Sequence, residues 1–361
     1  SVPGGKTFLT AWDKTFWRLD SEDRYSNDFR YPMRPGKKRS QNPISHGFYI
    51  DYALDDPRYL VGVASPGSSF GVEFGPGYTN DGGDTWTMFE GSPPRGWGYG
   101  GCIAASTREN FVLLPSNNGI GAWTKDGGKS WNSIRLDGVN ETGNFANAYY
   151  VARKNITADK TRPGVFALVY TVIQGGADPF GNPLGGVWLT TNGGETWRQT
   201  MKGMINDRDH SHASVVYPQD NRQFWRCQIE YVPEHSRELV YTPYADSTDD
   251  RLWWSRDDGA SWKELHSSIR AVRSFGFGPP APGQTRPSVY FSGEIDKVLG
   301  IYASFDWFAT KPVLVIRNPS PLLAEIIWVE GDRNRFGRVY LGAAAGGWLM
   351  LDVALKPGAL A

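Results

Sequence analysis

One carboxylate near the start of the chain lies among aromatic side chains, a setting that suits acid catalysis. Asp13 belongs to the stretch LTAWDKTFWRLD (9–20), where Trp12 precedes it and Phe16 and Trp17 follow it. Apolar neighbours exclude water from a carboxyl group and raise its pKa, so the group can hold a proton near neutral pH and donate it to a leaving group. The alternative is that Asp13 is a surface or hydrogen-bonded strand residue.

Several other acidic side chains could supply a second catalytic carboxylate. They are Glu230, Glu294 and Asp296, together with Asp207 and Asp209 beside the pair His210 and His212. A His-x-His pair places both imidazoles on one face of a strand, as in some metal sites, but no third ligand follows at a suitable spacing. We therefore expect no metal and no cofactor. For each carboxylate, the simpler interpretation is an ordinary turn or loop residue.

The chain is unusually rich in aromatic residues, with 15 Trp and 17 Tyr. Flat rings on an exposed rim are suited to stacking against the apolar face of a sugar, although packing within the fold accounts for most aromatic side chains. The candidate sugar-binding residues are Trp12, Trp17, Trp97 and Tyr99.

An eight-residue pattern, Ser/Thr-x-Asp-x-Gly-x-Ser/Thr-Trp, recurs along the chain. Four copies span 79–86, 124–131, 190–197 and 255–262, and a fifth at 304–310 lacks the glycine and the final tryptophan. Asp and Gly are typical of a tight hairpin turn, and the Trp is expected to fold under the loop as an apolar plug. The pattern resembles the Asp-box. We assign its residues a structural role: Asp81, Trp86, Asp126, Trp131, Asn192, Trp197, Asp257 and Trp262.

The spacing of these loops predicts the architecture. The third positions of the five copies are 45, 66, 65 and 49 residues apart, close to the length of a propeller blade where long loops are allowed for. Short alternating apolar runs between the copies read as strands. With a first blade at about 7–45 and a last at 324–354, we expect an all-β, seven-bladed β-propeller formed by residues 1–361 as one domain. The N-terminal strand should close the ring with 324–354, leaving no free sheet edge.

Composition excludes some functions. Lys and Arg together number 38, as do Asp and Glu, so no basic field favours nucleic acid. We find no apolar run long enough to span a membrane. Cys102 and Cys227 could pair or remain free thiols. The chain begins with Ser1, so either a leader was removed or a longer polypeptide was cut.

The N-terminal stretch is similar to the opening of the second propeller of glycoside hydrolase family 74, the xyloglucan-cleaving glucanases. The matching positions are Ala11, Asp13, Trp17, Arg18 and Asp20. Further similarity occurs at 55–63, 275–278, 300–304 and 337–342, so the resemblance covers nearly the whole chain.

This resemblance implies one half of a two-propeller inverting hydrolase that acts on a β-glucan or xyloglucan-type polysaccharide. Asp13 would be the general acid, and a carboxylate on the facing propeller, outside this chain, would be the general base. The expected location is extracellular, or within a surface or virion assembly.

Two alternatives remain. Trp12 and Phe16 stand where the family has glycine, and 342–347 lacks the family's polar residues, which favours a non-catalytic carbohydrate-binding or docking propeller. The stretch 29–32, FRYP, superficially resembles the arginine motif of sialidases, which also contain the Asp-box; the other residues of a sialidase site cannot be assigned.

Overall fold

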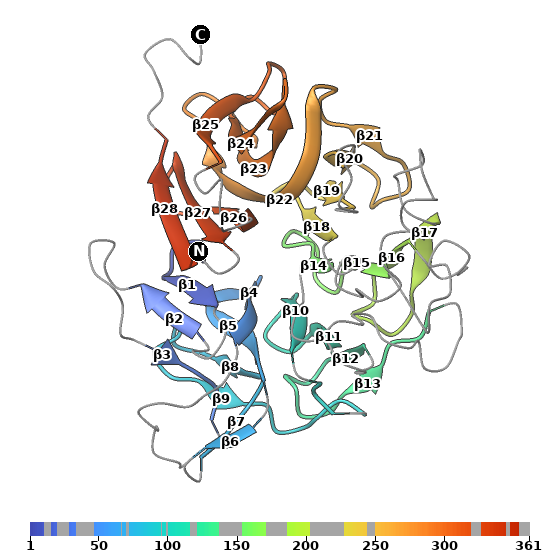
Figure 1. Ribbon diagram of the computed structural model, residues 1–361. Coiled ribbons are helices and arrows are strands. Elements are labelled where there is room, and N and C mark those ends of the chain that lie inside the picture. Colours follow the sequence, from blue (N-terminus) through green and yellow to red (C-terminus); the bar gives the residue numbers. More distant parts are fainter. Residues whose placement is uncertain are drawn as a thin grey trace, which may run out of the picture.

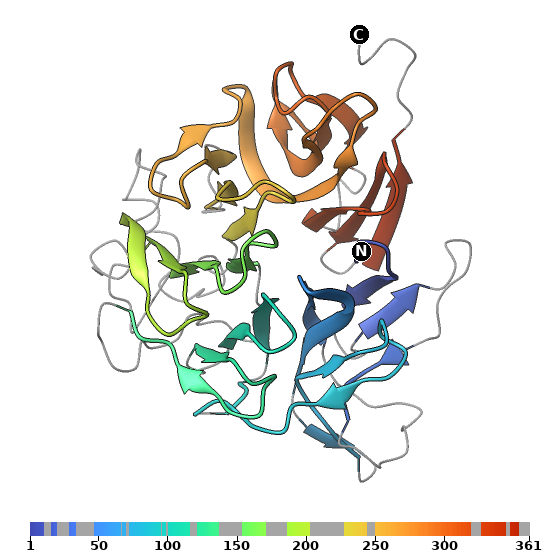
Figure 2. The ribbon, with the colours of Figure 1, turned by 180° about the vertical axis from the view of Figure 1, so that it is seen from behind.

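The chain folds into a ring of antiparallel β-sheets arranged around a central axis (Figure 1). The computed structural model describes residues 1–10, 16–19, 29–33, 47–65, 67–69, 72–94, 96–98, 100–115, 121–136, 154–170, 186–202, 227–243, 250–318, 326–343 and 347–353. All regular secondary structure in these ranges is β-strand. The view from behind shows the same ring (Figure 2).

Five sheets have four strands each. The first blade contains β4 (Gly47–Ala53), β5 (Asp56–Ala64), β8 (Gly77–Thr79) and β9 (Thr87–Met88), and the second contains β10 (Gly101–Ala105), β11 (Phe111–Pro115), β12 (Ala122–Thr124) and β13 (Asn132–Ser133). The third contains β14 (Ile156–Ala158), β15 (Phe166–Tyr170), β16 (Gly186–Thr190) and β17 (Arg198–Lys202), and the fourth contains β18 (Gln228–Tyr231), β19 (Leu239–Thr242), β20 (Trp253–Ser255) and β21 (Lys263–Glu264). The fifth contains β22 (Ile269–Pro280), β23 (Pro287–Ile295), β24 (Val298–Ser304) and β25 (Val313–Arg317). The first strand of each sheet lies nearest the axis (Figure 1).

A sixth blade and two smaller sheets complete the described strands. The sixth blade contains β26 (Ile326–Gly331), β27 (Arg338–Ala343) and β28 (Gly347–Asp352). The N-terminal sheet contains β1 (Thr7–Thr10), β2 (Phe16–Leu19) and β3 (Phe29–Arg30), and β6 (Gly67–Ser69) pairs with β7 (Val72–Phe74).

The β-propeller is confirmed, but the expected number of blades is wrong: the described residues form six blades, not seven. The N-terminal segment at about 7–45 is long enough for a full blade. The structure gives it three strands of four, four and two residues, a small sheet that lies between the last and first blades (Figure 1).

Hydrogen bonds join the two ends of the described chain. Asn334 Nδ2 donates to the carbonyl oxygens of Val2 (2.9 Å) and Gly5 (3.2 Å), and Gly4 N donates back to Asn334 Oδ1 (2.6 Å). Trp348 Nε1 of β28 donates to the carbonyl of Thr10 in β1 (3.2 Å). Strand β1 pairs with β2, and ring closure through 324–354 stays a prediction.

Blade packing explains why four strands of two neighbouring blades are buried on both faces. All residues of β10, β11, β15 and β16 are buried. Each of these strands is covered by its own sheet neighbours and by the adjacent blades, so its sequence reads as a continuous apolar run rather than an alternating one.

The repeated loops share one hydrogen-bond pattern. Thr124 Oγ1 donates to Asp126 Oδ1 (2.7 Å) and accepts from Gly128 N (3.1 Å), while Asp126 accepts from Ser130 N (2.9 Å) and Ser130 Oγ (2.5 Å). Equivalent bonds occur in the loops at 79–85, 190–196, 255–261 and 304–310. Each loop therefore binds its Ser/Thr and Asp or Asn side chains to its own backbone.

The fifth copy keeps this pattern without its glycine. Trp307 and Phe308 adopt φ of 55° and 62°, the left-handed region that glycine occupies without steric cost. Phe308 N still donates to Ser304 Oγ (2.7 Å), and the Phe308 ring is buried. The loop conformation thus depends on the hydrogen bonds of Ser304 and Asp306 more than on glycine.

We expect Asp126→Ala to destabilise the protein by about 2 kcal/mol, because it removes a charged acceptor of several hydrogen bonds. Urea unfolding checks this, with Glu109→Ala, an exposed change in the same blade, as control.

Partial burial alone would raise the pKa of Asp126, but hydrogen bonds from Ser130, Thr124 and Lys129 lower it to about 2.

The stabilisation by Asp126 should therefore be complete above about pH 4 and disappear as the pH falls towards 2, since the unfolded carboxyl titrates near 3.9. Equal stability of wild type and Asp126→Ala at pH 7 would contradict this account.

Candidate functional site

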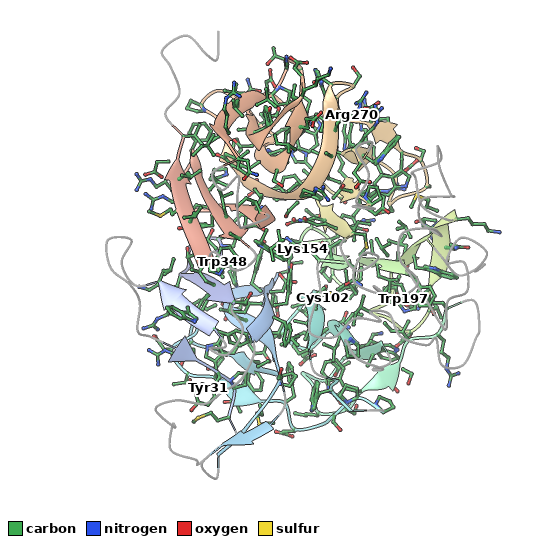
Figure 3. All side chains as sticks on the ribbon, in the orientation of Figure 1. Tyr31, Cys102, Lys154, Trp197, Arg270 and Trp348 are labelled. Carbon is green, nitrogen blue, oxygen red and sulfur yellow. The ribbon has the colours of Figure 1, made fainter. Side chains whose placement is uncertain are left out.

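A cavity of about 140 Å³ lies where the inner strands meet the N-terminal sheet. Strands β1, β4, β14, β18 and β26 contribute to its wall, together with Tyr340 of β27 and Trp348 of β28. Aromatic residues form part of the lining: Phe48, Tyr49, Tyr52, Trp328 and Trp348. We refer to this space as the central cavity. Figure 3 labels Lys154 near the middle of the ring and Trp348 at the side of the N-terminal sheet.

Four charged side chains form a buried network beside the central cavity. Lys154 Nζ lies 2.5 Å from Glu230 Oε1 and 3.6 Å from Glu330 Oε2. Arg333 Nη2 lies 2.9 Å from Glu230 Oε1 and 3.6 Å from Glu330 Oε1. Two cations thus face two carboxylates, and each cation contacts both. This mutual neutralisation is what permits four charges away from water.

Burial sets the ionisation of this network. It raises the pKa of Glu230; the Lys154 charge opposes that rise, and the Glu330 charge adds to it. Burial works to lower the pKa of Lys154, but the two carboxylates outweigh it and the net shift is upward. The same balance raises the pKa of Arg333. Both cations therefore keep their charge, while burial makes Glu230 easier to protonate than an exposed glutamate.

One oxygen of each glutamate is left without a hydrogen bond. Within the described residues, Glu230 Oε2 and Glu330 Oε1 are buried and have no hydrogen-bond partner, although Glu330 Oε1 keeps its longer ion-pair contact with Arg333. The Glu230 side chain is only 6% exposed. A buried carboxylate oxygen without a donor carries a free-energy cost, and the charges of Lys154 and Arg333 offset it.

A second ion pair at the cavity wall is fully satisfied. Lys160 Nζ donates to Asp51 Oδ2 (2.8 Å), to the Tyr52 carbonyl (2.6 Å) and to the Ala105 carbonyl (2.7 Å). Asp51 Oδ2 also accepts from Ala105 N (2.9 Å). These bonds connect three neighbouring blades, so the pair is structural.

Only some of the residues expected to take part in catalysis or sugar binding lie among the described residues. Asp13, Trp12 and Tyr99 lie outside the described residues. Trp17 is half-buried on β2, opposite Leu9 of β1.

Trp97 belongs to an aromatic group within the fold. Its ring stacks on Phe89, with centroids 5.8 Å apart, and meets the edge of Trp131 at 5.5 Å. The sugar-binding role of the four aromatic residues stays a prediction.

The remaining polar candidates have ordinary partners or lie outside the described residues. Asp296 forms an exposed ion pair with Lys311, and Glu294 lies opposite Arg270 in the β22–β23 ladder. Asp207, Asp209, His210 and His212 are outside the described residues. No group of three metal-binding side chains occurs in the described part of the chain.

Other features of the sequence are also accounted for. Arg30, the arginine of the sialidase-like stretch, donates to the Asp84 carbonyl (2.9 Å), and Arg18 pairs with the Asp84 carboxylate. Cys102 and Cys227 are buried free thiols. No helix that could cross a membrane is found among the residues described.

Sequence reasoning identified Glu230 but missed its partners. A usable signal existed: Asp51, Glu230 and Glu330 each interrupt an apolar run that forms the first strand of a blade. A charge at that position points towards the axis region, where another charge must neutralise it. Lys154 and Arg333 lie just outside strands, and no local pattern marks them.

We expect Lys154→Met to destabilise the protein by about 3 kcal/mol, because Glu230 and Glu330 would share one cation. Urea unfolding at pH 7 measures this, with Lys311→Met, which breaks an exposed pair and should cost below about 1 kcal/mol, as control.

Because the folded state raises the pKa of Glu230, the penalty in Lys154→Met should shrink as the pH falls and grow as it rises. A penalty no larger than that of Lys311→Met would show that the network is not stabilising.

Comparison with known proteins relates this architecture to a family. No protein-family model matches the chain. A xyloglucanase from Paenibacillus sp. is 26% identical over 342 residues, covering 90% of this chain and 28% of that protein. Xyloglucanase Xgh74A of Acetivibrio thermocellus is 24% identical over 311 residues, covering 86% and 31%. The chain therefore spans less than a third of the length of these relatives.

Solved structures share the fold. The GH74 enzyme of Niastella koreensis superposes with a TM-score of 0.66 at 19% identity, covering 99% of this chain and 42% of that one. The GH74 xyloglucanase from Xanthomonas campestris gives 0.62 at 20%, covering 97% and 43%. YCF48 bound to D1 peptide gives 0.55 at 14%, covering 98% and 90%. The chain is thus a β-propeller similar in sequence to xyloglucanases and in fold to family 74 enzymes.

Proposed function

We propose that this propeller is one half of a two-propeller glycoside hydrolase that engages a xyloglucan-type β-glucan outside the cell. The observation that carries the proposal is the similarity to xyloglucanases across 90% of this chain, which accounts for only 28% of the longer relative. The chain covers 42% of the solved family 74 enzyme of Niastella koreensis, about the share expected of one of two similar propellers. The repeated loops, with their shared hydrogen bonds, are interpreted as Asp-boxes that hold the blade hairpins.

Asp13 is the proposed general acid. In an inverting mechanism it would protonate the glycosidic oxygen, while a carboxylate on the facing propeller activates water on the other side of the sugar ring. The aromatic residues on either side of Asp13 would favour its protonated form. Trp12, Trp17, Trp97 and Tyr99 are the proposed stacking surfaces for sugar rings.

A non-catalytic glycan-binding or docking propeller is the second candidate. Trp12 and Phe16 add bulk beside Asp13 where the family has glycine. A non-catalytic propeller would bind the polysaccharide without cleaving it. The two candidate functions therefore differ in whether a product forms and not in whether the polysaccharide binds.

Reducing-end release from xyloglucan by the full native polypeptide tests hydrolysis. We expect Asp13→Asn to lower the rate by about 10² or more, within the usual contribution of general acid catalysis. Retained xyloglucan binding in the variant would separate lost chemistry from lost structure. If the wild type releases no reducing ends from xyloglucan or other β-glucans, the proposed hydrolase activity is wrong and the non-catalytic binding propeller is the better interpretation.

The stacking role can be tested apart from catalysis. Trp17→Ala and Trp97→Ala should each weaken xyloglucan binding about tenfold or more, since a stacked aromatic contributes about 1 kcal/mol beyond its buried area. Affinity electrophoresis measures this, with thermal unfolding as a check on folding because Trp97 also packs on Phe89. Unchanged affinity in a folded variant removes that residue from the binding surface.

A further inference from the structure

The outer edge of the sixth blade is a strand without the usual protection. Strand β28 pairs with β27 at six consecutive positions with no register shift, and no described strand pairs with its other side. Its sequence, GWLMLD, contains no lysine, arginine or proline. It lies on the outside of the ring in both views (Figures 1 and 2). Natural sheets protect such edges, because unpaired N–H and C=O groups pair readily with another strand.

The outer strands of the other five blades have the protection that β28 lacks. Strands β9, β13 and β21 have two residues each. Strand β17 begins with Arg198 and ends with Lys202, and β25 ends with Arg317; both meet their neighbouring strand with a register shift. Short length, positive charge and bulges each disfavour pairing with another sheet. Among the described outer strands, only β28 is long, regular and without positive charge.

Exposed apolar side chains gather at the same part of the molecule. Leu349 and Met350 of β28 are 40% and 38% exposed. The other large apolar side chains that are exposed in the described part of the chain belong to the neighbouring blade: Leu299, Val313 and Leu314. Side chains of β25 and β28 pack on one shared apolar cluster, so the two strands are neighbours. By contrast β16, which is also the third strand of its blade, is buried throughout. Strand β28 therefore has the composition of a covered strand.

One hydrogen bond establishes which backbone groups of β28 point outward. Val353 N donates to the Gly337 carbonyl (2.7 Å), in register with the β27–β28 ladder. Because successive residues of a strand direct their backbone groups to opposite sides, the N–H and C=O groups of Trp348, Met350 and Asp352 point away from β27. Each of these three residues offers one donor and one acceptor to an added strand.

A second copy of β28 satisfies these groups in one register. With the strands antiparallel and Met350 at the twofold axis, Met350 lies opposite Met350 of the second copy, and Trp348 lies opposite Asp352. Any shift moves at least one of the three outward-facing residues beyond the end of the other strand. Asp352 then faces an indole rather than another carboxylate, and Arg338 already balances its charge (2.7 Å).

The overall charge also favours a second copy over a charged partner. The chain has 38 Lys and Arg against 38 Asp and Glu, so two copies do not repel each other through their net charge.

We propose that β28 pairs antiparallel with β28 of a second copy of this chain, so that two sixth blades form one continuous sheet across a twofold axis. Leu349 and Met350 are covered in this sheet. Stable interfaces bury about 1,200 Å² or more, which one short pair of strands does not reach, so we expect micromolar rather than nanomolar affinity. The pairing does not depend on the proposed polysaccharide function.

Sedimentation velocity of the full native polypeptide, from about 1 to about 200 µM, tests the pairing. We expect the apparent mass to rise from that of one chain to that of two across this range. The mass of a single chain at every concentration would overturn the proposal.

Substitution assigns the contact to β28. Met350→Lys places two positive charges opposite each other at the axis, so the dissociation constant of the dimer should rise about tenfold or more. Thr191→Lys is the matched control, because it adds the same charge at an exposed loop position that Lys125 occupies in the second blade. It should leave the dimer unchanged. Equal dimerisation of the two variants would place the interface elsewhere and overturn the proposal.

A charge exchange tests the register. An equimolar mixture of Met350→Lys and Met350→Glu should dimerise more tightly than either variant alone, because opposite charges then meet at the axis. A mixture that dimerises no better than the separate variants would contradict the pairing.

Hydrogen exchange of the wild type decides if Met350→Lys does not fold. Protection of the Met350 and Asp352 amides that increases with protein concentration supports the pairing. Equal protection at every concentration would show that the same polypeptide covers β28, and no protection would show that nothing covers it. Either result overturns the proposal.

Discussion

The neutralisation of four buried charges at the axis is the constraint on which the arrangement of the ring depends. Lys154 precedes β14, and Glu230 lies on β18. Glu330 lies on β26 of the sixth blade, and Arg333 lies in the loop between β26 and β27. None of these groups could be buried alone without a cost of several kcal/mol. The blades that carry these charges must therefore pack in one relative orientation. Ion pairs fix that orientation more specifically than apolar contacts do, because they depend on the positions of individual atoms.

The repeated loops solve a different problem at the outer end of five of the six blades. A hairpin at the rim exposes backbone groups, and the Ser/Thr and Asp side chains satisfy these within the loop itself. Because these bonds are local, the chain can repeat the loop in five blades, and contacts such as Asn110 Nδ2 to the Gly193 carbonyl (2.9 Å) then join it to the neighbouring blade. The fifth copy shows the limit of this independence: its hydrogen bonds persist, while Trp307 and Phe308 take backbone conformations that cost energy.

The features best predicted from the sequence depend on residues close together in the chain, and the features missed depend on residues that only the folded ring brings together. The all-β class and the loop positions follow from turn chemistry and strand patterns read over short stretches. The blade count was wrong because the length of the N-terminal segment does not reveal that only short strands form in it. The charge network was largely missed, since Glu230 and Arg333 are 103 residues apart and only the folded ring brings them together. Asp13 is not among the described residues, so its environment remains a prediction from its neighbours.

The bonds from Asn334 to Val2 and Gly5 also bear on how the ring forms. They span more than 300 residues of sequence, so they can appear only after nearly all of the chain has been synthesised. Each blade can form as it leaves the ribosome, because its contacts are between residues close in sequence. Bringing Asn334 to Val2 and Gly5 instead closes a loop of more than 300 residues, and the entropy of loop closure is lost only at that step. The ring should therefore close as a late step, and until then the N-terminal sheet and the sixth blade would each present an uncovered face to chaperones.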